Sequence, residues 1–290
     1  PSGETTVLRE WLQREVDSPA FGFYGSLIES VVLPNFTLFA WLVFLTELFT
    51  GLALLFGVFV RPAASVGLLL SLNLWVGLKA VPDEWHWSYV LLAAWHLAVL
   101  LWNDSTAWSV RRWLPEPVRG FDEPVEPAGG KGSSAATALR IVLGLITAVT
   151  WWGNVDKDFY DGENLAGFFS WLFTPVADGG NGSSLTFVKS LLDATVLQAP
   201  EVAGWVLTVV ELFIAVGLLF GVFTRAAAVL AAGFFGSLFL SYFGGEEWIV
   251  VYVLLTMAAV VAFFGWGGRR FGLDQFVVAK HGESPATLAW

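Results

Sequence analysis

Long apolar runs dominate this chain, and most polar residues lie between them. A helix needs about 17–25 apolar residues to cross the hydrocarbon of a bilayer. Seven runs approach or reach that length, so the pattern predicts seven membrane-spanning helices. The runs are Phe36–Phe59, Pro62–Ala80, Trp87–Trp102, Ala135–Trp152, Val202–Phe223, Ala226–Phe243 and Trp248–Phe264.

Two regions between or before the spans have a mixed, amphipathic pattern. One is Val7–Val31, and the other is the long segment from Gly153 to Glu201, with apolar stretches at Phe168–Phe173 and Leu185–Leu197. Helices of this kind lie in the membrane interface rather than crossing it. We therefore expect amphipathic interfacial helices on one face of an all-α integral membrane protein.

The spans form two similar sets. Glu47 begins ELFTGLALLFGVFVRPAA and Glu211 begins ELFIAVGLLFGVFTRAAA, at an offset of 164 residues. This internal similarity predicts two tandem four-helix-bundle repeats. The predicted divisions are a first repeat at 1–113, a Pro/Gly/acid-rich linker at 114–134, a second repeat at 135–276 and a tail at 277–290.

The two repeats are unequal. Ala135–Trp152 precedes the outer segment of the second repeat, whereas the first repeat begins directly with its outer segment. We expect a native arrangement of eight spans. The sequence as given has only seven of them, and the missing first helix would leave an open groove on the first repeat. The alternative is a cleaved signal segment that leaves a mature seven-span protein.

Lys and Arg predict the orientation. Five of them fall on the side of the N-terminus and ten on the side of the C-terminus. Cytoplasmic loops carry the excess of Lys and Arg, so we expect a multi-pass protein of the cell membrane with its N-terminus outside and its C-terminus in the cytoplasm. The outer face then carries most of the acidic residues.

Composition narrows the chemistry. Hydrophobic residues make up 56% of the 290 and charged residues 14%, against about 25% charged in soluble domains. The chain has no Cys, which excludes disulfides, Fe–S clusters and thiol catalysis. A net charge of −10 argues against nucleic-acid binding. His86 and His96 are too far apart on one helix to ligate one haem iron, and we expect no haem or other metal in this chain.

Short motifs in the second repeat resemble the DoxX/DoxD family of four-helix membrane proteins, and in particular its DoxD-like small subunits of thiosulfate:quinone oxidoreductase. The matching residues are Arg140, Gly144, Lys157, Glu211, Gly217, Gly221, Arg225, Gly272, Leu273 and Asp274. The first repeat shares the signature in part, at Glu47, Gly57 and Arg61. The resemblance implies a quinone-linked membrane subunit that works with a second subunit to oxidise thiosulfate on the outer face.

Three polar residues inside the spans are candidate catalytic groups: Glu47, Glu211 and His96. An ionised carboxylate in hydrocarbon costs about 2.5 kcal/mol or more, so each Glu should be protonated, paired or next to a polar cavity. Either Glu could accept a proton during quinone chemistry or anchor a quinone carbonyl. The alternative is a protonated Glu that bonds a neighbouring helix and holds the bundle together. His96 could share a proton with Glu47, or be a satisfied packing residue.

Further candidates lie at the ends of spans. Trp151 and Arg225 join Glu47 and Glu211 as candidate quinone contacts, and Lys157 is the cation nearest the outer mouth of the second repeat, where it could meet an oxyanion. The plainer role for Arg225 and its counterpart Arg61 is to anchor a helix end at the interface. The acid excess would oppose a dianion at low salt, and with the preference for Arg over Lys it suggests a halophile.

Three functions are compatible with these features. The first is a quinone-linked subunit of a redox complex, possible only with a borrowed cofactor or partner because the chain lacks Cys. The second is a non-catalytic membrane subunit that assembles or stabilises a larger respiratory complex. The third is a small-solute transporter, which the uninterrupted spans favour least. Membrane lipids and other membrane subunits are the expected partners.

Overall fold

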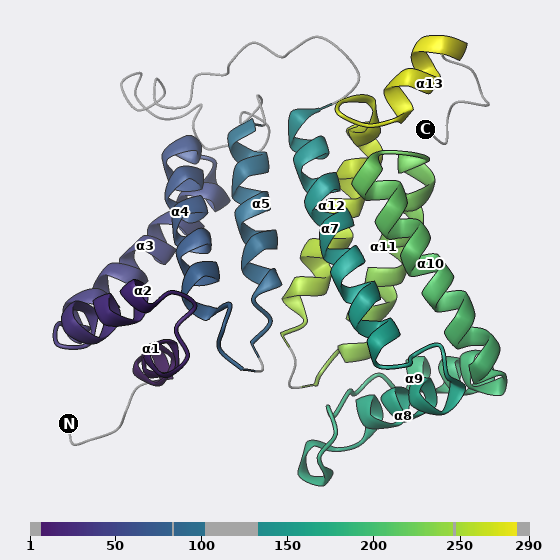
Figure 1. Cartoon of the computed structure of the whole chain (residues 1–290), viewed down its shortest axis with the longest axis horizontal. Helices are drawn as coiled ribbons and strands as arrows, with labels where there is room; N and C mark the ends of the chain where they lie inside the picture. Colours follow the sequence, from purple (N-terminus) through teal and green to yellow (C-terminus); the bar gives the residue numbers. More distant parts are fainter. Residues whose placement is uncertain (1–6, 83, 102–132, 246–247, 283–290) are drawn as a thin grey trace. The chain divides into compact units, whose positions relative to one another are not determined.

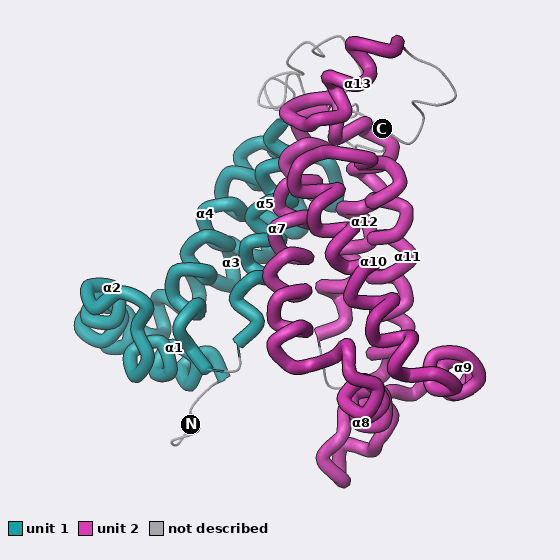
Figure 2. Tube along the Cα trace, turned by 45° about the vertical axis from the view of Figure 1, so that its right-hand side comes forward, with its two compact units in different colours: residues 1–129 teal, residues 130–290 magenta. Residues whose placement is uncertain are grey.

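A computed structural model describes residues 7–82, 84–101, 133–245 and 248–282, and within these ranges the chain is helical with no strand (Figure 1). The all-α prediction is therefore confirmed. The chain divides into two compact units, residues 1–129 (unit 1) and 130–290 (unit 2), which are coloured separately in Figure 2. The predicted linker, residues 114–134, lies almost wholly outside the described residues.

Unit 1 begins with short helices and continues with three apolar ones. The short elements are α1 (Val7–Asp17), α2 (Gly22–Leu27) and the π-helical turn η1 (Ile28–Val32). The apolar helices are α3 (Phe36–Phe56), α4 (Val60–Leu78) and α5 (Trp87–Leu101). The main contacts among them join α3 to α4 and α4 to α5, so the three form an open row.

The described residues of unit 2 form four apolar helices and a segment of shorter helices between the first two. The apolar helices are α7 (Ser134–Asp156), α10 (Pro200–Phe220), α11 (Thr224–Tyr242) and α12 (Val250–Phe264). Between α7 and α10 lie α8 (Gly162–Phe173), η4 (Val176–Asp178), α9 (Thr186–Ala194) and η5 (Val196–Gln198). The turn η6 (Gly267–Arg269) and α13 (Asp274–His281) follow α12. Because α7 packs on both α10 and α12, and α11 also packs on both, the four close into a ring.

The same tight corner joins α3 to α4 and α10 to α11. Gly57 and Gly221 end their helices in the left-handed region, at φ 64° and 65°. Phe59 and Phe223 precede the next helices, also at positive φ, 54° and 49°. Glycine adopts this conformation without strain, whereas phenylalanine rarely does. The GVF sequence that follows α3 and α10 nevertheless forms the same corner in each unit.

Among the described residues, five helices are long and apolar enough to span a membrane: α3, α4, α7, α10 and α11. The helices α5 and α12 are apolar but shorter. Long apolar side chains on their outward faces are exposed, as lipid-facing surfaces require; Leu55 is 73% and Phe264 73% exposed. The chain is thus a multi-pass membrane protein, and the eight-span tandem arrangement stays a prediction.

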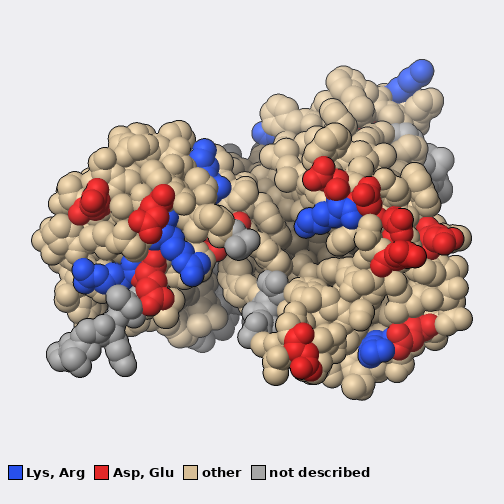
Figure 3. Space-filling model, turned by 60° about the horizontal axis from the view of Figure 1, so that its bottom comes forward, with Lys and Arg blue, Asp and Glu red and all other residues tan. Residues whose placement is uncertain are grey.

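Helices α8 and α9 lie at the end of unit 2 where α7 finishes and α10 begins (Figure 1). The predicted apolar stretches Phe168–Phe173 and Leu185–Leu197 fall on these helices. Figure 3 shows charged side chains on this end of unit 2, set in a surface that is otherwise uncharged. Residues 153–201 contain seven Asp or Glu and two Lys.

Candidate polar site between α7 and α10

Glu211 is buried in unit 2 and bonded to α7. Its side chain is 5% exposed, and the Asn154 amide Nδ2 donates to both carboxylate oxygens, at 2.9 and 3.1 Å. The close approach of the two helices depends on Gly144, where an added Cβ would lie 2.4 Å from the Leu219 backbone nitrogen. A small residue at a helix contact lets the two backbones meet, and so brings Asn154 to Glu211.

Asn154 is the site residue that sequence reasoning missed. The apolar run predicted for this helix stops at Trp152, whereas α7 continues through Gly153 and Asn154 to Asp156. A physical argument could have found Asn154. A buried carboxylate requires a hydrogen-bond donor, and the polar last turn of the preceding helix contains one.

Trp151 lies one helical turn before Asn154 on α7. Its indole Nε1 is buried and has no hydrogen-bond partner among the described residues. Lys157 follows Asn154 by three residues, at the exposed C-cap of α7. Residues three apart on a helix share a face, so Trp151 and Asn154 lie close together on α7, and Lys157 lies at the exposed end of that helix.

The structure places Arg225 elsewhere. Its guanidinium lies over the rings of Phe263 and Trp266, at 4.2 and 4.1 Å from their centroids, at the beginning of α11. Glu211 lies nine residues before the end of α10, about 14 Å away from this corner by helical rise. Arg225 and Glu211 therefore belong to different levels of the bundle.

Most of the residues that carry the sequence resemblance lie at the same level of the bundle as Arg225. Their contacts there hold the helices of unit 2 together. Arg140 is fully buried and donates to the carbonyl oxygens of Leu218, Leu219, Gly267 and Phe271. These bonds tie α7 to the end of α10 and to the turn after α12. Such a fully bonded guanidinium explains an Arg in an apolar helix without invoking catalysis.

Asp274 completes this closure. Its carboxylate accepts hydrogen bonds from the backbone N–H groups of Phe223 and Thr224, at 2.9 and 3.0 Å, at the start of α11. Gly272 allows the turn, because a Cβ there would lie 2.4 Å from the Gly268 carbonyl oxygen. Burial raises the pKa of Asp274 and the hydrogen bonds from Thr224 oppose that rise.

The two candidate residues in unit 1, Glu47 and His96, have different surroundings. Glu47 is exposed on α3 and forms no hydrogen bond or ion pair with the described residues. The His96 ring on α5 packs against Gly67 of α4, where a Cβ would lie 2.3 Å from its Cε1. Glu47 and His96 thus lie on different helices, α3 and α5, which flank α4 in the open row.

A further buried carboxyl in unit 1 was not anticipated. Glu15 of α1 is 6% exposed and packs on Gly77 of α4, where a Cβ would lie 2.6 Å from Oε2. That oxygen has no hydrogen-bond partner among the described residues. Burial raises the pKa of Glu15 to about 7, and burial together with the nearby Glu15 charge raises the pKa of Tyr24.

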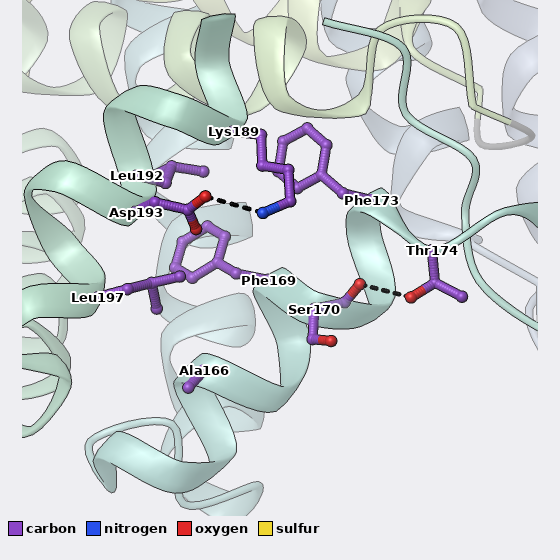
Figure 4. Close-up of a pocket in the computed structure, with 9 residues that line it drawn as sticks. All are labelled: Ala166, Phe169, Ser170, Phe173, Thr174, Lys189, Leu192, Asp193 and Leu197. Atoms are coloured by element: carbon purple, nitrogen blue, oxygen red, sulfur yellow. Dashed lines mark hydrogen bonds and ion pairs between the residues drawn. The ribbon is translucent and has the colours of Figure 1, made fainter. Parts of the chain in front are cut away.

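A cavity of about 290 Å³ lies between α8 and α9 in unit 2 (Figure 4). Phe169, Phe173 and Leu197 give it apolar walls, and Lys189 and Asp193 form an ion pair of 2.8 Å at its edge. None of the candidate catalytic, quinone or oxyanion contacts named from the sequence lines it, although both predicted amphipathic stretches do. Within the described residues, no group of three or more His, Cys, Asp or Glu could hold a metal ion.

Comparison with known proteins gives one match. The DoxX family model matches residues 18–80, which contain α2, η1, α3 and α4 of unit 1. The sequence resemblance to DoxX-like membrane proteins is therefore confirmed, in the repeat that carries its signature less completely. Searches among curated proteins and among solved structures found no match.

Proposed function

We propose that this protein, a membrane protein that is DoxX-like over residues 18–80, is a quinone-linked subunit of a redox complex. The observation that carries the proposal is the unpaired, buried indole N–H of Trp151 on the same helix face as the Asn154–Glu211 pair. A quinone presents two carbonyl acceptors on a flat apolar ring, and a buried donor beside a carboxyl is the chemistry that would recognise it.

Each residue of this site has a separate role in the proposal. The Trp151 Nε1–H donates to a carbonyl of the bound ring, and Glu211 holds or releases a proton at its carboxylate. The Asn154 amide keeps that carboxylate oriented. A quinone would supply the electron acceptor, since the chain offers no Cys for redox chemistry of its own.

The proposal also names the electron donor, thiosulfate, and the kind of complex. Thiosulfate would be oxidised on the outer face by a partner subunit, with Lys157 as the exposed cation at the mouth of unit 2. The excess of acids in residues 153–201 would repel a dianion, and salt screens such repulsion. We therefore expect the thiosulfate-dependent rate to rise with ionic strength, as it would in a halophile.

The test compares two neighbouring tryptophans in the purified full-length protein. Trp151→Phe removes the buried donor, whereas Trp152→Phe alters a side chain that is 67% exposed. Loss of one hydrogen bond of about 1.4 kcal/mol weakens binding about tenfold, so decylubiquinone affinity measured by calorimetry should fall by that factor for Trp151→Phe alone. Equal affinities for both variants, or no binding by the parent protein, would refute the proposal.

Glu211→Gln separates proton transfer from binding. An amide can still be held next to Asn154, so decylubiquinone should bind with little change. Thiosulfate-dependent quinone reduction in membranes should fall by about a hundredfold, the range of general acid–base contributions. Unchanged turnover would show that Glu211 is structural.

A second candidate function is assembly of a larger membrane complex without catalysis. The observation that favours it is the open row of unit 1, with the carboxyl of Glu47 on an exposed helix face. A lone carboxyl facing lipid is unfavourable, and contact with another subunit would remove that cost.

A further inference from the structure

One end of unit 2 is basic. It is formed by the α10–α11 corner, η6 and α13, and it lies opposite α8 and α9 (Figure 1). Residues 264–282 contain three Lys or Arg and one acid, Asp274, and Arg225 adds a further cation at the start of α11. The Asp274 carboxylate is already bonded to backbone N–H groups of the corner. Cations therefore dominate this end, which we call the basic end of unit 2.

Two of these cations share one aromatic ring. The Cζ atom of Arg225 lies 4.1 Å from the ring centroid of Trp266, and that of Arg269 lies 3.7 Å from the same centroid. Arg225 also lies 4.2 Å from the ring of Phe263. Because a ring face attracts a guanidinium, these contacts hold both positive charges beside a single indole.

The local fold brings the two arginines together. Trp266 has a positive φ of 52°, and the chain turns there from α12 into η6. Gly268 of that turn packs on the start of α11, where an added Cβ would overlap the Thr224 side chain. Thr224 and Gly268 directly precede Arg225 and Arg269 in the sequence. Their contact therefore places the two like charges side by side.

Two half-buried guanidiniums at this distance repel each other, and an anion bound by both would offset the repulsion. A phosphate suits them best, because the planar fork of an arginine donates paired hydrogen bonds to phosphate oxygens. Basic sites between membrane helices bind anionic lipid headgroups in this way.

The surroundings of the pair favour a lipid over a soluble phosphate. Phe264, at the end of α12, is 73% exposed, and Phe271, directly after the two arginines of η6, is 75% exposed. Large exposed rings next to cations are typical of the zone where headgroups meet hydrocarbon. A soluble phosphate would have no contact with these rings, whereas acyl chains would cover them.

We propose that Arg225, Trp266 and Arg269 form a binding site for the phosphate of an anionic membrane lipid, whose acyl chains lie against Phe264. A zwitterionic lipid is the poorer ligand, since its headgroup carries a cation that the two arginines would repel. The site is independent of the quinone proposal, because Arg225 and Glu211 lie at different levels of the bundle.

Native mass spectrometry of the purified full-length protein tests the ligand class. The protein in detergent would be titrated with palmitoyl-oleoyl phosphatidylglycerol or with the phosphatidylcholine that has the same chains. We expect the first phosphatidylglycerol to bind about tenfold more tightly, the effect of one charge-assisted hydrogen bond. Equal affinities for the two lipids would overturn the proposal, and this comparison requires no variant.

Variants locate the site. Arg225→Gln and Arg269→Gln should each weaken phosphatidylglycerol binding about tenfold, by loss of a bond to the phosphate. Lys280→Gln removes the same charge at an exposed position of α13 and should leave the affinity unchanged. Thermal unfolding in detergent would check that each variant is folded. Equal losses for the three variants would show attraction to the whole basic end and would overturn the site.

Arg269→Lys separates the shape of the guanidinium from its charge. Lysine keeps the positive charge but lacks the planar fork, so this variant should bind phosphatidylglycerol more weakly than the parent protein. Full affinity of Arg269→Lys would reduce the interaction to net charge and would contradict a built phosphate site.

A competitor and a second ligand distinguish the remaining sources of binding. Glycerol phosphate, the headgroup without acyl chains, should not displace phosphatidylglycerol at equal concentration, and displacement would identify a soluble phosphate as the ligand instead. Decylubiquinone affinity should be the same for Arg225→Gln and the parent protein. A loss of quinone binding with lipid binding intact would assign Arg225 to the quinone and overturn the lipid site.

Discussion

Glu211 and Glu47 begin two segments of similar sequence, yet their surroundings differ. Glu211 is buried and receives two hydrogen bonds from Asn154, whereas Glu47 is exposed and has no partner among the described residues. The identity of a residue therefore does not decide its role here. What decides it is whether a neighbouring helix brings a donor to the same depth.

Asn154→Leu should destabilise unit 2 by about 1–3 kcal/mol, because it leaves the buried Glu211 carboxyl without its donor. Combining it with Glu211→Leu should recover much of that loss, since two apolar side chains need no hydrogen bond. Thermal unfolding in detergent measures both. Asn164→Leu, at an exposed position, is the control, and a double variant as unstable as the single one would contradict the pairing.

Arg140→Lys should cost about 3 kcal/mol or more. A lysine ammonium cannot reach the carbonyls that the guanidinium bonds on α10 and around η6, and some of those carbonyls would stay unsatisfied. Arg270→Lys provides a half-buried control in the same loop. Similar unfolding temperatures for the two variants would show that the Arg140 network is not the main closure of unit 2.

At the scale of elements, glycines determine how closely helices approach. Gly144 contacts the α10 backbone, so Gly144→Val should weaken α7–α10 packing by about 1–3 kcal/mol. Gly153→Val, on the same helix but with nothing within 4 Å of its Cβ, should cost less. Comparison of the two by thermal unfolding isolates the effect of packing from that of helix propensity.

Helix α1 should respond to pH through Glu15. The pKa of Glu15 is raised by burial from 4.5 to about 7 in the docked helix, so between these values the docked state binds more protons than the released one. Docking of α1 is then strongest below about pH 4.5, weakens as the pH rises to about 7 and is weakest above that. The docking equilibrium constant should differ between the two extremes by up to about two orders of magnitude.

A nitroxide on Val7→Cys, an exposed position of α1, reports this change by electron paramagnetic resonance. Its mobility should increase from pH 5 to pH 8.5, a range in which Tyr24, whose pKa is about 12, stays neutral. Glu15→Gln should abolish the dependence. A label whose mobility changes equally in both proteins would assign the effect to another group.

At the scale of the whole molecule, the apolar runs were sufficient to locate the apolar helices and the helices between α7 and α10. Run length and hydropathy are local properties, but they do not show where a helix turns: the runs continue to Phe59 and Phe223, whereas α3 ends at Phe56 and α10 at Phe220. The Asn154–Glu211 pair could not be predicted in this way, because it depends on which turn of α7 faces the middle of α10. Hydropathy also ended that helix at Trp152, so the polar last turn was assigned to a loop.

The orientation is a prediction for the whole chain, based on the distribution of Lys and Arg. Asp178→Cys lies in the α8–α9 segment and Lys280→Cys in α13, and both positions are exposed. A membrane-impermeant maleimide added to intact cells should label the first and not the second. Labelling of Lys280→Cys instead would place the C-terminus outside.

The corner that ends α10 joins parts of unit 2 that lie far apart in the sequence. Arg140 of α7 donates to the carbonyl oxygens of Leu218 and Leu219, on one side of the corner. Asp274 of α13 accepts hydrogen bonds from the backbone N–H groups of Phe223 and Thr224, on its other side. Opening this corner would therefore release the first and the last helix of unit 2 together, so the two ends of the unit are expected to unfold in one step.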